Sequence, residues 1–250
     1  MTVVSSLVGR STDAAHCSLE LLQHFRLYSD GHMMRLGQPA EHLIALLAVD
    51  ERSHTRDHLA GCLWPDSTQS RAASSLRRVL SLMQPIAPEL IVREGHRLSL
   101  SDAVRVDIRL QRSLIDYIIS GERTAVDRAE LGLLRRDLLP DWGDLWLTPL
   151  RVELRQLRLL SLEALAVAQL DLGRPHAALP VALCAALDEP LRESAHRLVV
   201  EAHLALGNHA AAARHYADYR RSLWSELRLR PGLRMESLMR PFLSDGYSAS

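Results

Sequence analysis

Lysine is absent from this chain: all 30 of its basic residues are arginines, and 30 acidic residues balance them to a formal net charge of zero. The balance excludes a strongly basic protein of the kind that binds nucleic acid indiscriminately. A GC-rich coding genome gives the same arginine bias, so the number of arginines is by itself weak evidence for phosphate binding. Any binding of a polyanion would have to come from a local cluster.

Cysteine, aromatic residues and long apolar runs are also scarce. The three cysteines, Cys17, Cys62 and Cys184, are far apart and lack C-x-x-C spacing, which argues against a disulfide framework or a structural zinc site. With two phenylalanines and 4% aromatics, the core has to consist of leucine, alanine and valine, which favours helices. No apolar run is long enough to span a membrane and the N-terminus does not resemble a secretion signal, so we expect a cytoplasmic protein.

Common catalytic motifs are missing as well. There is no G-x-S-x-G elbow, phosphate-binding loop, dinucleotide fingerprint or H-E-x-x-H pair, so we expect no enzyme and no cofactor. His54, His58 and Cys62 have the spacing of metal ligands on one helix. Thr55, however, is expected to cap that helix and to leave His54 outside it, so we expect no metal.

The stretch "DWGDLW" offers a second candidate for chemistry. Asp141 and Asp144 could form a carboxylate pair. A loop between helices that is anchored by Trp142 and Trp146 is the simpler interpretation, and we favour it.

The first hundred residues alternate between short β-prone runs and helical patterns. Residues 19–36 predict a hairpin at Asp30-Gly31, and residues 90–100 predict another at Glu94-Gly95. Between them we expect three helices: one over Pro39 to Val49, a short one capped by Thr55 and ended by Trp64-Pro65, and one from about Gln69 to Gln84. A hairpin, three helices and a second hairpin form a winged helix-turn-helix, whose third helix is placed to enter a DNA groove.

The third helix has two distinct faces. One is an apolar stripe that should pack on the core, formed by Ala72, Ala73, Leu76, Val79, Leu80 and Met83. The other is small and cationic, with Arg71, Ser74 and Arg78 on the exposed side and Ser75 and Arg77 on its flanks. Small side chains let a helix lie deep in a major groove, where arginines reach guanine edges or phosphates.

The second hairpin adds cations where a wing would meet the DNA backbone. Arg93, His96 and Arg97 surround Gly95. From Arg71 to Arg97 five arginines face two glutamates, a local balance of +3. Taken alone, an arginine-rich helix face is more often a solvated face; the order of the elements favours DNA binding.

Beyond Ser101-Asp102 the pattern is helical almost to the end, and it contains a repeat. "LDLGRPHAAL" from Leu170 and "LALGNHAAAA" from Leu204 align at a spacing of 34, with Gly173 opposite Gly207. This period is typical of tetratricopeptide helix pairs, in which small residues allow close helix packing. The fold class we expect is mainly α: a winged helix-turn-helix with short β-hairpins, then an all-α tetratricopeptide-like domain.

These motifs resemble the SARP type of bacterial transcriptional activators, the antibiotic-regulatory proteins, over about residues 18–243. The resemblance rests on "HLAGCLWPDS", "SRAASSLRRVLSLM" and "GHRLSL" in the first part. In the second part it rests on "LLPDWGDLW", "RVELRQLRLLSLEALA", "EPLRESAHRLVVEAHLALGNHAAAARHYADYR" and "LWSELRLRP". The second set is similar to the bacterial transcriptional activation domain. The chain departs from the family at Gln23-His24 and at Arg228, where small residues or glycine are usual, and at Arg135-Arg136-Asp137.

The resemblance implies an OmpR-like winged helix that binds direct repeats in promoters of biosynthetic genes, associates with itself on tandem sites and engages RNA polymerase holoenzyme. It places Arg71, Ser74, Ser75, Arg77 and Arg78 on the recognition helix, and Arg93, His96 and Arg97 at the wing. We expect a flexible N-terminus (1–17), the winged domain (18–102), the helical activation domain (103–243) and a flexible tail (244–250). The alternative is a helical-repeat adaptor for proteins whose winged module is vestigial.

Overall fold

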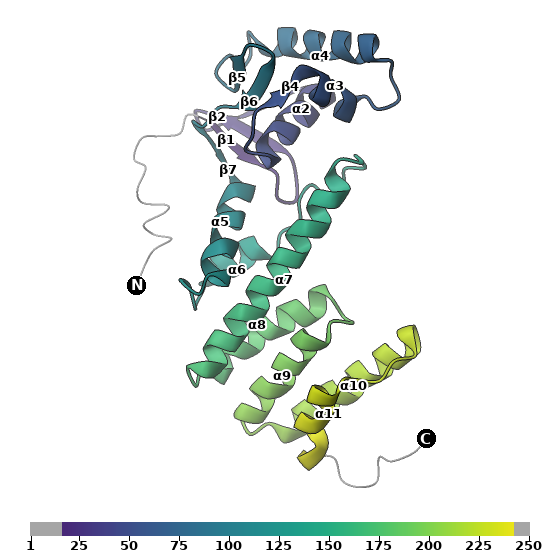
Figure 1. Cartoon of the computed structure of the whole chain (residues 1–250). Helices are drawn as coiled ribbons and strands as arrows, with labels where there is room; N and C mark the ends of the chain where they lie inside the picture. Colours follow the sequence, from purple (N-terminus) through teal and green to yellow (C-terminus); the bar gives the residue numbers. More distant parts are fainter. Residues whose placement is uncertain (1–16, 243–250) are drawn as a thin grey trace. The chain divides into compact units, whose positions relative to one another are not determined.

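The computed structural model describes residues 17–242, and these form two compact units (Figure 1). The first unit combines residues 17–111 with residues 136–149, and the second combines residues 112–135 with residues 150–242. The boundary expected after Asp102 stays a prediction, and the units interleave along the chain. The flexible ends expected at 1–17 and 244–250 lie outside the described residues, except for Cys17, which begins the first strand.

A four-stranded sheet opens the first unit. It contains β1 (Cys17–Glu20), β2 (Arg26–Ser29), β3 (His32–Met34) and β7 (Val104–Val106), in the order β3-β2-β1-β7. Asp30 and Gly31 join β2 to β3 with φ of 49° and 78°, the left-handed values of a tight hairpin turn. The first predicted hairpin is therefore confirmed.

Strand β7 was not expected. The prediction of helix directly beyond Asp102 is wrong at residues 104–106, because Val104 and Val106 are buried on alternate positions while Arg105 between them is exposed. This strand pairs in parallel with β1, about 87 residues earlier in the chain, as the register of Cys17 with Val104 shows. Three residues are too few for their alternation to be recognised in the sequence.

Three helices follow the hairpin as predicted: α2 (Gln38–Val49), α3 (Arg56–Leu63) and α4 (Gln69–Met83). The Thr55 side-chain oxygen accepts a hydrogen bond from the backbone N–H of His58 at 3.3 Å and so caps α3. The apolar faces supply the buried core of the unit, including Leu43, Ile44, Leu47, Leu59 and Leu76, each at most 1% exposed.

The wing is a three-stranded sheet. Strands β5 (Ile91–Glu94) and β6 (Arg97–Leu100) form the second predicted hairpin, with Gly95 at a φ of 58°. A two-residue strand that the sequence did not suggest, β4 (His54–Thr55), pairs with β6 and gives the order β4-β6-β5. Because β4 immediately precedes α3, the wing is joined by backbone hydrogen bonds to the start of that helix.

Residues 136–149 pack on the first unit although they follow it in the chain. The backbone N–H of Gln23 donates to Asp137 at 2.7 Å, and that of Leu139 donates to the carbonyl of Leu21 at 3.0 Å. Helix α5 (Asp107–Ile119) also begins in this unit. The stretch "LLPDWGDLW" is therefore a structural part of the winged unit.

The second unit is helical. After the later part of α5 it contains α6 (Arg128–Leu134), α7 (Leu147–Asp171, from residue 150), α8 (Pro175–Asp188), α9 (Glu193–Ala205), α10 (His209–Leu227), α11 (Leu233–Met239) and the 3-10 turn η1 (Arg240–Phe242). Figure 1 shows α8, α9 and α10 as successive helices of one array. The predicted helix pairs are confirmed.

The 34-residue repeat extends to individual hydrogen bonds. Gly173 N–H donates to Leu170 at 2.9 Å, and Gly207 N–H donates to Leu204 at the same distance. Both glycines are left-handed, with φ of 67° and 73°. A β-carbon would strain this conformation, so the glycines end α7 and α9 in the same way.

Two departures from the family pattern coincide with left-handed backbone. Gln23 has a φ of 82° and Arg228 a φ of 58°; at both places the resemblance implies glycine or a small residue. Arg228 ends α10, and its guanidinium lies 5.9 Å from the ring centroid of Trp224. Both positions thus have a left-handed backbone and a side chain that disfavours it.

Candidate nucleic-acid interface

Helix α4 has the two faces that the sequence predicts. Ala72, Leu76, Val79, Leu80 and Met83 are buried, with Ala73 partly buried beside them. Arg71, Ser74, Arg77 and Arg78 are exposed, and Ser75 is half-buried. No acidic residue lies between Ser67 and Gln84, so the exposed face carries positive potential only.

The arginines of α4 differ in how they are held. Arg77 donates to the Ala73 carbonyl at 3.3 Å and to the Ser74 hydroxyl at 3.0 Å, and Ser74 in turn donates to the Ser70 carbonyl at 2.8 Å. Arg71 and Arg78 make no hydrogen bond or ion pair to any of residues 17–242. Their guanidinium groups are therefore available to an external acceptor without loss of a protein contact.

The cationic residues of the wing also differ in their hydrogen-bond partners. Arg93 donates to the Leu80 carbonyl at 3.3 Å, near the C-terminal end of α4. Arg97 donates to the Ser53 hydroxyl at 2.7 Å and to the Ser53 carbonyl. The imidazole of His96 is exposed, and its backbone carbonyl accepts from Arg56 N–H at 3.1 Å. Sequence reasoning placed Arg93, His96 and Arg97 in the wing but missed the partners Ser53 and Leu80, because contacts across 44 and 13 residues leave no local signal.

The histidines near α3 form a row of contacts. His54 lies 3.4 Å from the Asp50 carboxylate, its ring stacks on that of His58 at 5.1 Å, and His58 lies 3.6 Å from the Cys62 sulfur. Burial lowers the pKa of His54, with His58 and Arg97 acting in the same direction and Asp50 opposing them. Within the described part of the chain, no group of three such side chains has the geometry to hold a metal ion.

The loop "DWGDLW" anchors residues 136–149 to the first unit. The Trp142 ring stacks on His42 of α2 at 4.1 Å and on Phe25 at 5.9 Å. Asp144 lies 2.9 Å from Nδ1 of His42, and both side chains are 18% exposed. A loop between helices anchored by tryptophan is thus confirmed for Trp142: it connects α6 to α7 and packs on α2 and on the residues between β1 and β2.

The second unit contains a partly buried histidine pair. Nδ1 of His196 on α9 lies 3.0 Å from Nε2 of His215 on α10, and the other ring nitrogen of His196 contacts the Pro190 carbonyl at 2.9 Å. The ring of His196 also stacks on Tyr219 at 4.3 Å. Burial, reinforced by the neighbouring His196 and His203, lowers the pKa of His215 to about 4. These satisfied positions join α9 to α10.

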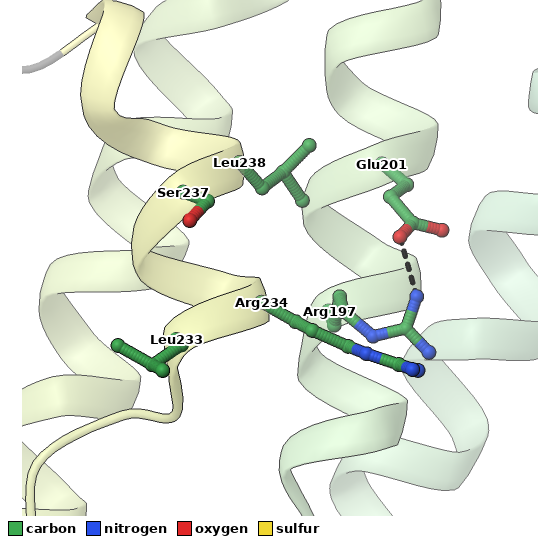
Figure 2. A pocket seen from close by; sticks show the side chains of 6 residues that line it. All are labelled: Arg197, Glu201, Leu233, Arg234, Ser237 and Leu238. Carbon is green, nitrogen blue, oxygen red and sulfur yellow. Dashed lines mark hydrogen bonds and ion pairs between the residues drawn. The ribbon is translucent and has the colours of Figure 1, made fainter.

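A shallow hollow of about 520 Å³ lies between α9 and α11 (Figure 2). It is lined by Arg197, Glu201, Leu233, Arg234, Ser237 and Leu238. Arg197 pairs with Glu201 at 2.5 Å, and Figure 2 shows the Arg234 side chain extending toward them. The hollow is open to solvent and is lined by side chains of both charges, and no sequence motif predicted it.

No helix among residues 17–242 is long and apolar enough to cross a membrane.

Comparison with known proteins gives matches to both parts of the chain. Residues 121–243 match the family model described as bacterial transcriptional activator domain. Regulatory protein AfsR of Streptomyces coelicolor is 30% identical over 227 residues, which cover 83% of this chain and 22% of the relative. Regulatory protein AfsR of Streptomyces griseus is 25% identical over 236 residues, which cover 87% of this chain and 24% of the relative. The chain thus spans about a quarter of the length of these relatives.

One solved structure shares the fold over most of the chain. It is that of Mycobacterium tuberculosis EmbR in complex with a low-affinity phosphopeptide, with a TM-score of 0.71 at 19% identity. The likeness covers 91% of this chain and 65% of that chain. The fold of this chain is therefore shared with a solved protein.

Proposed function

Because a winged helix-turn-helix precedes a bacterial transcriptional activator domain in a chain similar to AfsR, this chain belongs to the SARP type of transcriptional regulators, and we propose that it activates transcription by binding promoter DNA. The observation that carries the proposal is the exposed, acid-free face of α4, on which Arg71 and Arg78 have no partner among the described residues. The proposed function needs no catalysis and no cofactor.

The recognition helix would supply both affinity and selectivity. Small residues at Ser74 and Ser75 let α4 approach the floor of a major groove, so that the flanking arginines can reach base edges and phosphates. Contacts to phosphates position the protein, whereas contacts to bases select the sequence. Since the chain is neutral overall, this local cation cluster favours selective over indiscriminate binding.

The second unit would connect bound DNA to the transcription machinery. We propose that the protein recognises direct repeats in promoters of biosynthetic genes, that copies associate side by side on tandem sites, and that they engage RNA polymerase holoenzyme. The match of residues 121–243 to the activator-domain family supports this assignment. Footprints on two adjacent repeats, together with stimulated transcription by purified holoenzyme, would test it. A helical-repeat adaptor would leave such DNA unprotected.

The DNA-binding proposal is tested on a duplex that the wild-type chain selects from random-sequence DNA. Arg78→Ala, which removes a base-reading residue, should cost about 1–3 kcal/mol and relax sequence choice, whereas Arg77→Ala should lower the salt-dependence slope by about one. Arg105→Ala, an exposed arginine on β7, is the matched control and should change neither. Fluorescence anisotropy at several salt concentrations gives both quantities. Unchanged binding in both α4 variants would mean that this face is not the interface.

A further inference from the structure

The two wing arginines are held by the protein itself, in contrast to two arginines of α4. Arg97 donates through Nε to the Ser53 hydroxyl at 2.7 Å and through a second nitrogen to the Ser53 carbonyl. Two bonds from one guanidinium to one residue form a fork that fixes the orientation of the side chain. Ser53 lies just ahead of β4 and α3. The fork therefore ties the wing to the entry of the helix-turn-helix.

Backbone contacts reinforce the same junction. Thr55, which caps α3, pairs with Arg97 in the β4–β6 ladder. The N–H of Arg56, the first residue of α3, donates to the His96 carbonyl at 3.1 Å. The first residues of α3 and the turn of the wing are thus joined by both side-chain and main-chain hydrogen bonds.

Arg93 makes the corresponding contact on the other strand of the wing. Its guanidinium donates to the Leu80 carbonyl at 3.3 Å, in the last turn of α4. The Leu80 carbonyl also accepts from Gln84 N–H at 3.2 Å, so Arg93 is a second donor to it, and its positive charge interacts favourably with the C-terminal end of the helix dipole. Arg97 and Arg93 hold the wing at two separate points, one at the start of α3 and one at the end of α4.

We infer that Arg97, with Arg93 in support, is a positioning residue that fixes the wing relative to the recognition helix, and that its guanidinium does not neutralise a DNA phosphate. The inference rests on the proposed DNA binding and refines it. Direct contacts then come from Arg71, Arg77 and Arg78 on α4, and from the exposed His96 at the wing.

Salt dependence separates positioning from contact. Each phosphate neutralised by a side chain contributes about 0.9 to the slope of log K against log salt concentration. Arg97→Gln should raise Kd about three- to tenfold with the slope unchanged, and Arg71→Gln should lower the slope by about 0.9. If Arg97→Gln instead lowers the slope by that amount, Arg97 is a phosphate contact and the inference is overturned.

The substitution Arg97→Lys also separates a positioning role from a phosphate contact. Arg97→Lys keeps the charge but cannot form the fork, so it should weaken binding as much as Arg97→Gln does. Arg71→Lys, at a contact position, should retain most of the binding. Wild-type affinity in Arg97→Lys would show that residue 97 contacts DNA through its charge and does not act by positioning the wing.

Amide hydrogen exchange tests the positioning role of Arg97 without DNA. In the full chain, Arg97→Gln and Ser53→Ala should each speed exchange in residues 53–56 and 96–99. Ser53→Ala removes only the hydroxyl bond and keeps the carbonyl bond, so its effect should be smaller, and adding it to Arg97→Gln should change little. Unchanged exchange in both single variants would overturn the inference even if DNA binds. If the wild-type chain selects no duplex while exchange responds as stated, the proposed function is wrong, but the positioning role of Arg97 in the wing is retained.

Discussion

Acidification should loosen the second unit through the contact between His196 and His215. Nδ1 of His196 and Nε2 of His215 lie 3.0 Å apart, so one of them must be without a proton for the bond to form. Burial lowers the pKa of both rings, and that of His215 falls from 6.5 to about 4. A lowered histidine pKa means that the unfolded chain binds protons more readily. The stabilisation is therefore complete above the ordinary pKa of 6.5 and is lost as the pH falls from there toward 4.

The magnitude follows from that pKa. With a folded value of about 4 and an unfolded value of 6.5, linkage gives a loss of about 2 kcal/mol between pH 7.5 and pH 5. Because the His215 ring is only partly buried, solvent screens part of this effect, and we expect about 1–2 kcal/mol. The lowered pKa of His196 acts in the same direction.

Hydrogen exchange resolved by segment is the suitable assay, because the two units need not unfold together. After correction for the intrinsic pH dependence, protection of α9 and α10 should fall by about five- to thirtyfold from pH 7.5 to pH 5. His215→Gln should remove most of this response, whereas His176→Gln, an exposed position on α8, should retain it. An equal loss of protection in wild type and His215→Gln would refute the assignment. In the first unit, burial raises the pKa of Asp107. Acidification therefore favours the folded state through this carboxyl group, opposite to its effect through the two histidines.

Two further substitutions test packing away from the interface. Arg228→Gly should stabilise the second unit by about 0.5 kcal/mol in urea unfolding, because relief of the left-handed strain at φ 58° outweighs the lost contact with Trp224; a destabilised variant would show that the strain is small. Asp144→Ala should cost about 1 kcal/mol by removing the bond to His42, and should speed protease cleavage within residues 136–149. Unchanged cleavage would show that Trp142 and the backbone hydrogen bonds hold the loop without the contact between Asp144 and His42.

Much of the winged unit could be predicted because its signals are local. Thr55 caps α3, glycine turns lie at Gly31 and Gly95, and the apolar stripe of α4 follows the helical period. Strand β7 could not be predicted, since its three residues become a strand only by pairing with β1. Sheet formation of this kind depends on the partner more than on intrinsic propensity.

The candidate site shows the same limit. Sequence period placed Arg71 and Arg78 on the exposed face of α4, and the structure confirms that exposure. Their role in binding DNA stays a prediction. The sequence could not show that Arg93 and Arg97 donate inward, because acceptors such as the Leu80 carbonyl are backbone atoms, which every residue carries.

The return of residues 136–149 to the first unit limits how this protein can be taken apart. A fragment ending at residue 102 would lose Asp107, whose carboxylate accepts from Leu21 N–H and Leu22 N–H at 2.9 Å each, and would expose the face of α2 that Trp142 covers. The winged unit is therefore incomplete in a fragment that ends at residue 102. A fusion protein that is to keep the winged unit intact should carry the chain through residue 149, because a shorter fragment would leave the face of α2 under Trp142 open to solvent.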